Sequence, residues 1–489
     1  MAAAVLLSLL SLLGAGLMAA PAALATDCTS EACFDALPVD RSWRGAIDLD
    51  DVPNRYQGAG ITVASIDTGV TPNVDLGPRL LARVDFTDDH DGLDTLGHGT
   101  HIAGLIAGSG VVMESQEGAA PEANLVSVKV AGWDGATDAS TVIAALRWVV
   151  SNKDRYGIRV VSLAWGTDAG SAVERDPLAA AVERAVDAGL VVVVAAGNRG
   201  PGRVTRPGDD ASVITVGAAD VNGTATGADD TIAPFSSFGT IGGDRKPDLL
   251  APGVSLISDR APGSTVDAAH PGARVGDRLF KGSGTSQAAG IVAGVAARIL
   301  EANPGLTPAQ VKAALVRSGD RRLTGPAAGA GLIDAWVAVG SVLPFKRSGP
   351  LSALPEVTAL AATLPVGRST GLGSLAAARG SAPLVADVDG DGLPDDLAGE
   401  VDALGAPWTP LSLREPWTAA TWAATAWAPR VAEIAGSAPA PPWTGPSAPL
   451  LAWDAAYWGA RGLDDAGFDA RYWGARYWGA RYWGTGAWE

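Results

Sequence analysis

The stretch Ile61-Thr62-Val63-Ala64-Ser65-Ile66-Asp67-Thr68-Gly69 decides how this chain is expected to fold. Its first six residues are mostly apolar and rich in β-branched side chains, which is typical of a strand buried on both faces. Strands of this kind form parallel sheets covered by helices, and such sheets collect their reactive residues at the carboxyl ends of the strands. Asp67 occupies such an end.

Further apolar runs and helix-like stretches continue this pattern from about Gly60 to Val339. The predicted strands are Ile61–Ile66, Leu125–Val130, Arg159–Leu163, Leu190–Ala195 and Val213–Val216. The predicted helices are Thr100–Ala107, Ala139–Asn152, Leu178–Ala188 and Ala309–Arg317, the last of which begins with Thr307 as N-cap and Pro308 at the first helical position. This alternation predicts an α/β fold: a doubly wound, mainly parallel sheet with helices on both faces.

Two later segments complete a candidate nucleophile: Gly97-His98-Gly99-Thr100-His101 and Gly284-Thr285-Ser286-Gln287-Ala288-Ala289. A carboxylate, an imidazole and a hydroxyl are the parts of a charge-oriented serine nucleophile, and here they follow in the order Asp, His, Ser. An α/β-hydrolase would place its serine first, and a chymotrypsin-like protease would place its histidine first. On these residues the chain resembles the subtilisin-like (subtilase, S8-type) serine peptidases, a resemblance that covers roughly Gly60 to Val339.

The resemblance implies a role for each of these side chains. Ser286 would be the nucleophile, His98 the general base and then acid, and Asp67 the buried carboxylate that orients the imidazole. Asn198 matches the side-chain donor of the family's oxyanion hole, with the backbone N–H of Ser286 as its companion. His101 lies about one helical turn after His98, and we expect it to have a structural role.

The peptide-binding residues are also expected from the resemblance. The segment Ser162–Gly166 aligns with the strand along which subtilases bind an extended peptide, and Ala195–Gly197 aligns with the far wall of the pocket for the residue before the scissile bond. The expected substrate-binding residues are Ala164, Trp165, Gly166, Ala195, Ala196 and Gly197. The family commonly has Ser-Leu-Gly where this chain has Ala164-Trp165-Gly166, so Trp165 either alters a subsite or packs beneath the strand.

Two departures from the family pattern lie beside the nucleophile. Gln287 stands where methionine is usual, and Gly290 stands where proline is usual. The loss of a proline removes a preset backbone angle, which is a modest stability effect. Neither change touches an atom that transfers a proton.

The composition bounds the class of protein and its partners. The chain has 489 residues, 47% hydrophobic residues and a net charge of −17, which fits a globular protein with a large core. The acidic balance disfavours a nucleic-acid partner. Protein or peptide substrates are what the resemblance to subtilases implies. An apolar run over Val5–Met18 followed by small residues predicts a signal peptide, residues 1–25, and therefore secretion.

A short N-terminal segment, residues 26–59, follows the predicted cleavage site. It holds both cysteines of the chain, Cys28 and Cys33, which would close only a small loop in an oxidising compartment. Roughly 35 residues separate the cleavage site from the first predicted strand. We therefore expect that folding and inhibition do not use a folded prodomain.

The catalytic region is expected to span residues 60–343, followed by a linker over residues 344–403. The linker contains Asp387-Val388-Asp389-Gly390-Asp391-Gly392-Leu393-Pro394-Asp395, which resembles the calcium loop of EF-hand-like modules. The candidate ligands are Asp387, Asp389, Asp391 and Asp395, but Ala398 stands where the usual glutamate would be. A solvated acidic turn is the alternative, and the peptidase chemistry itself needs no cofactor.

Residues 404–489 form a tryptophan-rich region. Eleven of the 16 tryptophans lie beyond residue 400, and the pentad Arg-Tyr-Trp-Gly-Ala recurs from Arg471 to Gly484. Trp417, Trp422 and Trp427 share the spacing of five, which matches neither a helix nor a strand. One hypothesis is that this region contacts cell-wall glycan or other surface material; the other is a poorly ordered or self-stacked extension.

These patterns together indicate a secreted serine endopeptidase. The competing hypothesis is a catalytically silent cell-surface binding protein that uses the same fold and an aromatic tail. A scaffold has no need of Asn198 together with Asp67, His98 and Ser286, so the sequence favours the enzyme.

Overall fold

A computed structural model describes ten stretches of the chain. These are residues 42–111, 116–170, 172–202, 204–241, 244–343, 368–380, 384–386, 395–397, 399–409 and 416–436. The predicted signal peptide, both cysteines and the pentad repeats after residue 436 lie outside the described residues.

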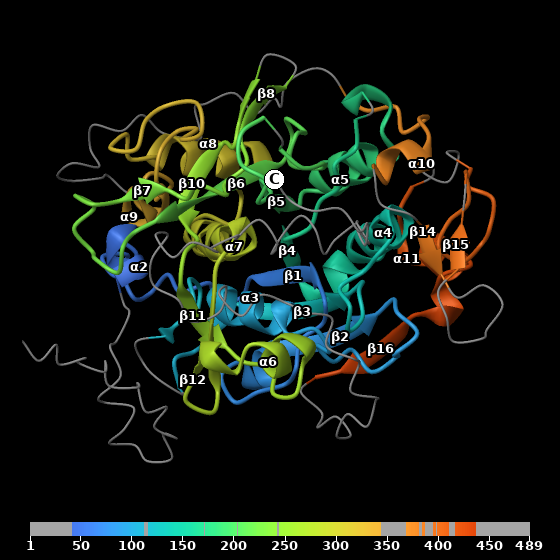
Figure 1. Ribbon diagram of the computed structural model, residues 1–489, viewed down its shortest axis with the longest axis horizontal. Coiled ribbons are helices and arrows are strands. Elements are labelled where there is room, and N and C mark those ends of the chain that lie inside the picture. Colours follow the sequence, from blue (N-terminus) through green and yellow to red (C-terminus); the bar gives the residue numbers. More distant parts are fainter. Residues whose placement is uncertain are drawn as a thin grey trace, which may run out of the picture.

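The described part of the chain is built around one nine-stranded sheet (Figure 1). Its strands are β1 (Thr62–Asp67), β2 (Leu80–Asp85), β3 (Asn124–Lys129), β4 (Ile158–Leu163), β5 (Val191–Ala195), β6 (Ile214–Asp220), β7 (Thr231–Ile232), β10 (Leu249–Pro252) and β16 (Ala432–Ala435). The order is β10-β6-β5-β4-β1-β3-β2-β16, with β7 beside β6. All pairs are parallel except β2 with β16 and β6 with β7. The predicted parallel sheet is confirmed.

All five predicted strands are present to within a few residues of their expected ends. The structure adds β2, β10 and β16, which the sequence did not single out. Smaller sheets pair β8 (Gly239–Ile241) with β9 (Asp244–Lys246), β11 (Leu256–Asp259) and β12 (Arg274–Val275) with β13 (Leu279–Gly282), and β14 (Leu384–Ala386) with β15 (Asp395–Leu397). Asp67 ends the central strand β1, as expected.

Helices cover both faces of the sheet. The helices are α2 (Ser42–Ala46), α3 (His98–Ala107), α4 (Ala139–Tyr156), α5 (Pro177–Asp187), α6 (Thr265–Ala269), α7 (Thr285–Ala302), α8 (Pro308–Ser318), α9 (Ala335–Gly340), α10 (Leu375–Ala378) and α11 (Ala419–Ala423). One apolar core lies between the sheet and α3, α7, α8 and α9, and the other lies between the sheet and α4 and α5. Both layers are visible in Figure 1, where α7 lies near the centre. Among these described helices, none is both long and apolar enough to span a bilayer.

One helix start was predicted from its capping residues, and the structure shows a second capped start that was not predicted. Thr307 caps α8 through a hydrogen bond from the backbone N–H of Gln310, and the Gln310 side chain returns the bond, with Pro308 at the first position. Asp138 caps α4 by accepting a hydrogen bond from the backbone N–H of Ser140. Side chains of this kind satisfy N–H groups that have no partner inside the helix.

The described C-terminal segments pack against the same core as α4 and α5. In Figure 1, α10, α11 and β16 (orange) lie on the side of the molecule that carries α4, α5 and β2. Trp417 and Trp422 are buried there, and the rings of Trp422 and Trp427 approach Phe86 with centroid separations of 5.7 and 5.9 Å. Trp417 lies just ahead of α11, Trp422 lies in α11, and Trp427 is the N-cap residue of the 3-10 helix η8 (Ala428–Arg430), after which β16 extends the sheet.

The predicted linker over residues 344–403 needs a correction for its described part. Residues 368–380 are not a spacer, because Leu375 is fully buried between α4 and α5. Both carboxyl oxygens of Glu183 on α5 accept a hydrogen bond from the backbone N–H of Ser369, at 2.9 and 3.0 Å. Docking of this segment therefore involves a buried carboxyl group.

The Glu183 carboxyl makes this docking sensitive to pH. Its pKa is raised to about 8, mainly by burial and also by the nearby Asp210, while the N–H of Ser369 and the charge of Arg368 oppose the shift. A carboxyl whose pKa is raised by folding holds its proton in the folded state between about pH 4.5 and 8, so stability falls as the pH rises through that window. Glutamine cannot ionise. We therefore expect the Tm of Glu183→Gln minus the Tm of the wild type to increase as the pH rises through this window, and to stay constant above it. Paired thermal melts from pH 5 to 9 check this, and a constant difference in Tm would contradict it.

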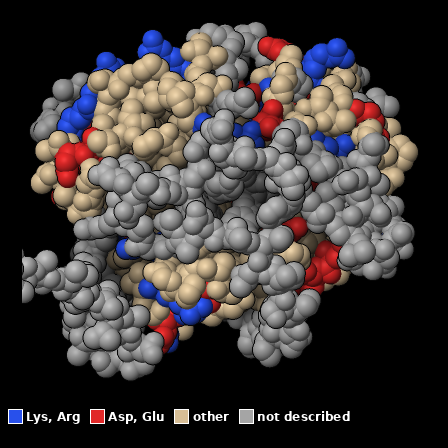
Figure 2. All heavy atoms as spheres, viewed as in Figure 1, with Lys and Arg blue, Asp and Glu red and all other residues tan. Residues whose placement is uncertain are grey.

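Acidic and basic side chains are mixed on the surface. Figure 2 shows Lys and Arg (blue) and Asp and Glu (red) scattered among uncharged residues (tan) on the described part of one face. Charges of both signs interspersed in this way, with a net charge of −17 for the whole chain, favour solubility.

Candidate active site

The Asp67 and His98 side chains meet where β1 ends and α3 begins. His98 Nδ1 lies 2.7 Å from Asp67 Oδ1, and both side chains are buried. The same carboxylate oxygen accepts the backbone N–H of Thr68 at 2.8 Å, which fixes the carboxylate. The Thr68 hydroxyl also lies 3.3 Å from this oxygen, and the three contacts hold Asp67 in the orientation that an imidazole partner requires.

Close backbone approach brings α3 to the end of β1. The backbone N–H of Gly99 donates to Thr68 Oγ1 at 2.9 Å. A Cβ atom at Gly99 would overlap the carbonyl oxygen of Gly69 and lie 3.1 Å from Asp67 Oδ1. The glycine that follows His98 is therefore required for the contact between His98 and Asp67.

Asp94 supports this arrangement, although the sequence did not single it out. Its carboxylate accepts the backbone N–H groups of Gly97 and Thr100 and the hydroxyl of Thr68, each at 2.7 Å. The group is buried, and burial raises its pKa above the ordinary value against the effect of these hydrogen bonds. Asp94 thus joins the start of α3 to the segment after β1. The only signal in the sequence is an acidic residue just ahead of a helix start.

Asn198 presents a donor beside the start of α7. Its Oδ1 accepts the backbone N–H and the hydroxyl of Thr285, both at 2.9 Å. Because a backbone N–H can only donate, this contact assigns the amide orientation and directs Nδ2 elsewhere. Nδ2 is buried and has no partner among the described residues. An unpaired donor beside the first turn of α7 is available to a ligand oxygen.

Ser286 lies in the first turn of α7, where backbone N–H groups have no partner within the helix. Its hydroxyl donates to the carbonyl oxygen of Ala164 at 3.3 Å. Among the described residues, this is the only hydrogen bond of the hydroxyl. The nucleophile thus touches the expected peptide-binding segment. The structure brings Asp67 to His98 and Asn198 to the residue before Ser286.

Trp165 packs beneath the peptide-binding segment. Its side chain is 1% exposed and belongs to the core under α4 and α5. Side chains alternate along a strand, so Leu163 and Trp165 face that core while Ala164 faces α7 and Ser286. Of the two alternatives left by the sequence, the structure supports packing.

A loop that contains Thr205 and Arg206 joins the two expected walls of the substrate pocket, residues 164–166 and 195–197. Thr205 donates its backbone N–H to the carbonyl oxygen of Ala196 at 3.0 Å, and Arg206 and Thr167 exchange backbone hydrogen bonds at 2.8 and 2.9 Å. A Cβ atom at Gly166 would lie 2.5 Å from Thr205 Oγ1. The segments 164–166 and 195–197 therefore lie side by side.

His101 has the structural role expected for it. Its Nε2 lies 3.1 Å from the carbonyl oxygen of Phe280 and 3.3 Å from that of Leu256. Burial lowers its pKa to about 3, and the nearby His98 contributes to this shift. A neutral imidazole that bonds two carbonyl groups anchors α3 to the small sheet of β11 and β13.

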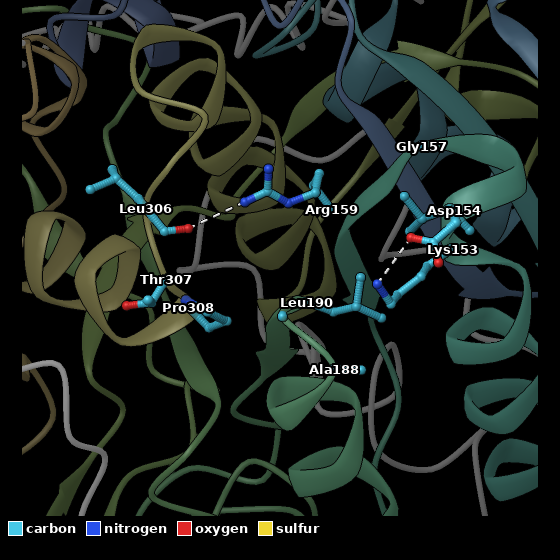
Figure 3. A pocket seen from close by; sticks show the side chains of 11 residues that line it. Lys153, Asp154, Gly157, Arg159, Ala188, Leu190, Leu306, Thr307 and Pro308 are labelled. Carbon is cyan, nitrogen blue, oxygen red and sulfur yellow. Dashed lines mark hydrogen bonds and ion pairs between the residues drawn. The ribbon is translucent and has the colours of Figure 1, made fainter. Parts of the chain in front are cut away.

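A pocket elsewhere on the molecule is separate from these residues (Figure 3). It is lined by Gly157 and Arg159 at the start of β4, Leu190 before β5, and Leu306 and Thr307 before α8. Arg159 donates to the carbonyl oxygen of Leu306 at 3.2 Å, as drawn in Figure 3. This pocket opens at the amino ends of the strands, whereas Asp67 lies at a carboxyl end.

The described residues contain no cluster of three or more His, Cys, Asp or Glu side chains suited to a metal ion. Of the candidate calcium ligands, Asp387, Asp389 and Asp391 lie outside the described residues, and Asp395 begins β15. Calcium binding stays a prediction.

Comparison with known proteins now decides the family. The subtilase family (peptidase S8) matches residues 58–332, more than half of the chain. The chain belongs to the subtilase family. This match confirms the resemblance drawn from Asp67, His98 and Ser286, and it covers nearly all of the predicted catalytic region.

Individual relatives agree with this assignment. The chain is 46% identical over 274 residues to the serine protease AprX of Bacillus subtilis, covering 54% of this chain and 62% of AprX. It is 33% identical over 285 residues to subtilisin Savinase of Lederbergia lenta, covering 58% of this chain and 91% of that protein. A solved protease of Pseudoalteromonas arctica shares the fold with a TM-score of 0.50 and 26% identity, over 62% of this chain and 97% of that one. The chain thus spans less than two thirds of AprX.

Proposed function

We propose that this subtilase is a secreted serine endopeptidase that hydrolyses peptide bonds with Asp67, His98, Ser286 and Asn198. The observation that carries the proposal is the buried, unpaired Nδ2 of Asn198, beside a buried contact of 2.7 Å between Asp67 and His98. A silent binding scaffold would gain nothing from an unsatisfied buried donor, which costs stability. The serine proteases among the relatives add support.

In the proposed mechanism, Ser286 Oγ attacks the carbonyl carbon of the peptide bond while His98 takes its proton. For this step the hydroxyl leaves the carbonyl oxygen of Ala164 and turns toward the imidazole. Asp67 keeps the Nδ1–H of His98 directed at its carboxylate and stabilises the imidazolium. His98 then gives the proton to the leaving amine, and water repeats the sequence to release the acid.

The developing oxyanion would receive two donors. Asn198 Nδ2 has no partner to give up, and the backbone N–H of Ser286 is in the first turn of α7. Donors already in place cost no reorganisation when charge develops in a water-excluded site. The peptide would lie along residues 164–166, as an added strand.

A serine-directed phosphonate tests the proposed function. We expect it to label the full-length chain at one residue, which peptide mapping would assign to Ser286. Folded protein that resists labelling, or labelling at another serine, would favour the silent scaffold.

Asn198→Ala is expected to lower kcat about 10²–10³-fold with little change in KM, the size measured for a corresponding donor in another subtilisin. The Nδ2 donor of Asn198 has no partner among the described residues, so its hydrogen bond forms only as the oxyanion develops. Steady-state kinetics on a peptide substrate measure this. Asn198→Asp is the matched control, since it keeps an acceptor for Thr285 but offers no donor, and it should lose at least as much. Near-normal kcat in the aspartate variant would rule out the proposed donor.

Three finer points stay predictions. Secretion depends on the predicted signal peptide, and surface contact depends on the pentad repeats. Calcium binding depends on the alternating carboxylates from Asp387 to Asp395. Calorimetric titration of the full-length chain with calcium, with Asp389→Asn as comparison, would detect a loop site as heat that the variant lacks.

A further inference from the structure

Two loops leave the sheet on either side of Asp67, because β1 lies between β3 and β4. The loop after β3 starts at Val130, whose N–H donates to the carbonyl oxygen of Asp67 at 2.9 Å, and it ends at Asp138, the N-cap of α4. The loop after β4 starts with the peptide-binding segment 164–166 and continues through Thr167. A peptide bound beside Ser286 must fit between structures that these two loops position.

One buried arginine from the C-terminal part reaches the end of the first loop. We call residues 368–380 and 399–409 the strap. Arg379 Nε donates to Asp138 Oδ2 at 2.5 Å, and its other nitrogens donate to the carbonyl oxygens of Gly399 and Val401. Arg379 and Asp138 are 4% and 6% exposed. A buried ion pair with these additional hydrogen bonds is costly to break by removing one partner.

The same turn of the strap reaches the second loop. The hydroxyl of Thr167 donates to the carbonyl oxygen of Ala378 at 2.8 Å. At Gly380, where φ is +68°, a Cβ atom would overlap Asp168 Oδ1 and lie 2.8 Å from the backbone nitrogen of Ala169. Three consecutive strap residues, 378–380, thus contact both loops.

The second loop is in turn connected to the oxyanion donor. Asp168 Oδ2 forms an ion pair of 2.8 Å with Arg199, the residue after Asn198. The strap itself is fixed at its far end by the buried Leu375 and by the hydrogen bonds between Ser369 and Glu183. It therefore forms a cross-link between two loops at the active edge of the sheet.

We propose that the strap sets the separation of these two loops for an extended peptide, and that Arg379 is a positioning residue for substrate binding. The proposal rests on the proposed peptidase function of the same site. Arg379 acts through Asp138 and its own backbone, and it does not touch Ser286 or His98. Its loss should therefore weaken binding of a long peptide more than the chemical step.

The test compares two substrates on the full-length chain: an extended peptide that fills several subsites and a small activated ester. For Arg379→Ala we expect KM for the extended peptide to rise about tenfold, with kcat and the ester kinetics within about twofold of the wild type. Arg379→Lys, which keeps the charge but not the forked hydrogen bonds, should recover part of the loss. Arg368→Ala is the matched control, since Arg368 is in the strap but forms an exposed ion pair with Asp187, far from both loops in sequence. It should leave KM unchanged.

Equal changes in KM for both substrates, or an unchanged KM in folded Arg379→Ala, would overturn the proposal. If that variant does not fold, Thr167→Val removes only the hydroxyl that bonds Ala378. It should then raise KM for the extended peptide about threefold, and an unchanged KM there would count against the strap. Loss of phosphonate labelling in the wild type would instead reject the peptidase function.

Discussion

Replacing Ser286 by alanine is expected to lower kcat on a peptide substrate about 10⁶-fold, the size found for the nucleophile of a related subtilisin. The alanine removes the one oxygen that the imidazole can activate, while Asn198 and the backbone N–H of Ser286 remain. Folding should be unaffected, because among the described residues the hydroxyl forms only the 3.3 Å hydrogen bond to the carbonyl oxygen of Ala164. KM should stay within a few-fold of the wild type.

A second variant checks that Ser286 and His98 act as a unit. When two groups serve a single proton transfer, removing both costs about as much as removing either one. We expect the double variant Ser286→Ala, His98→Ala to be no slower than Ser286→Ala alone. A further large loss in the double variant would mean that His98 contributes by another route, and the proposed proton transfer would be wrong.

The central elements of the site follow from local sequence alone. The apolar run before Asp67 predicts a buried strand, and the small residues around His98 and Ser286 permit a close approach at two helix starts. The strand and both helix starts can be predicted from residues that are neighbours in the sequence. The expected positions are met: Asp67 ends β1, His98 begins α3 and Ser286 lies in the first turn of α7.

Contacts between segments that are far apart in the sequence could not be predicted from neighbouring residues. Asp94 resembles any loop carboxylate until Thr68 and the first turn of α3 are placed around it. The segment 432–435 becomes a strand only because β2 offers an unpaired edge. Arg379 and Asp138 are 241 residues apart, so nothing in either neighbourhood predicts their ion pair.

The orientation of Trp165 follows from its neighbours in the sequence. Val161, Leu163 and Trp165 alternate with the residues between them, and all three belong to the core under α4 and α5. The unusual identity of Trp165 at this family position left open a change in a subsite. The direction of its side chain, into the core, rules that change out. Directions along a strand are therefore better evidence than substitutions at aligned positions.

Asp67→Asn is expected to lower kcat about 10⁴-fold, the size found when the corresponding carboxylate of a subtilisin is removed, while leaving the protein folded. Asp67 Oδ1 accepts both from His98 Nδ1, at 2.7 Å, and from the backbone N–H of Thr68, at 2.8 Å. An asparagine can place its carbonyl oxygen there, which keeps both hydrogen bonds but removes the charge that stabilises the imidazolium. In the flipped orientation its amide would face the N–H of Thr68 and force the wrong tautomer on His98.

The fixed N–H of Thr68 decides between these orientations, because two donors cannot share the site. The loss in Asp67→Asn should therefore come from the missing charge, with the imidazole still in its wild-type position in a crystal structure of the variant. Asp94→Asn is the matched control: it changes a buried carboxylate that bonds Thr68 and the start of α3 but does not touch His98. It should lower Tm while kcat stays within about tenfold of the wild type. If Asp67→Asn retained a kcat that close to the wild type, the carboxylate would not be serving the imidazole, and the contact between Asp67 and His98 would be structural only.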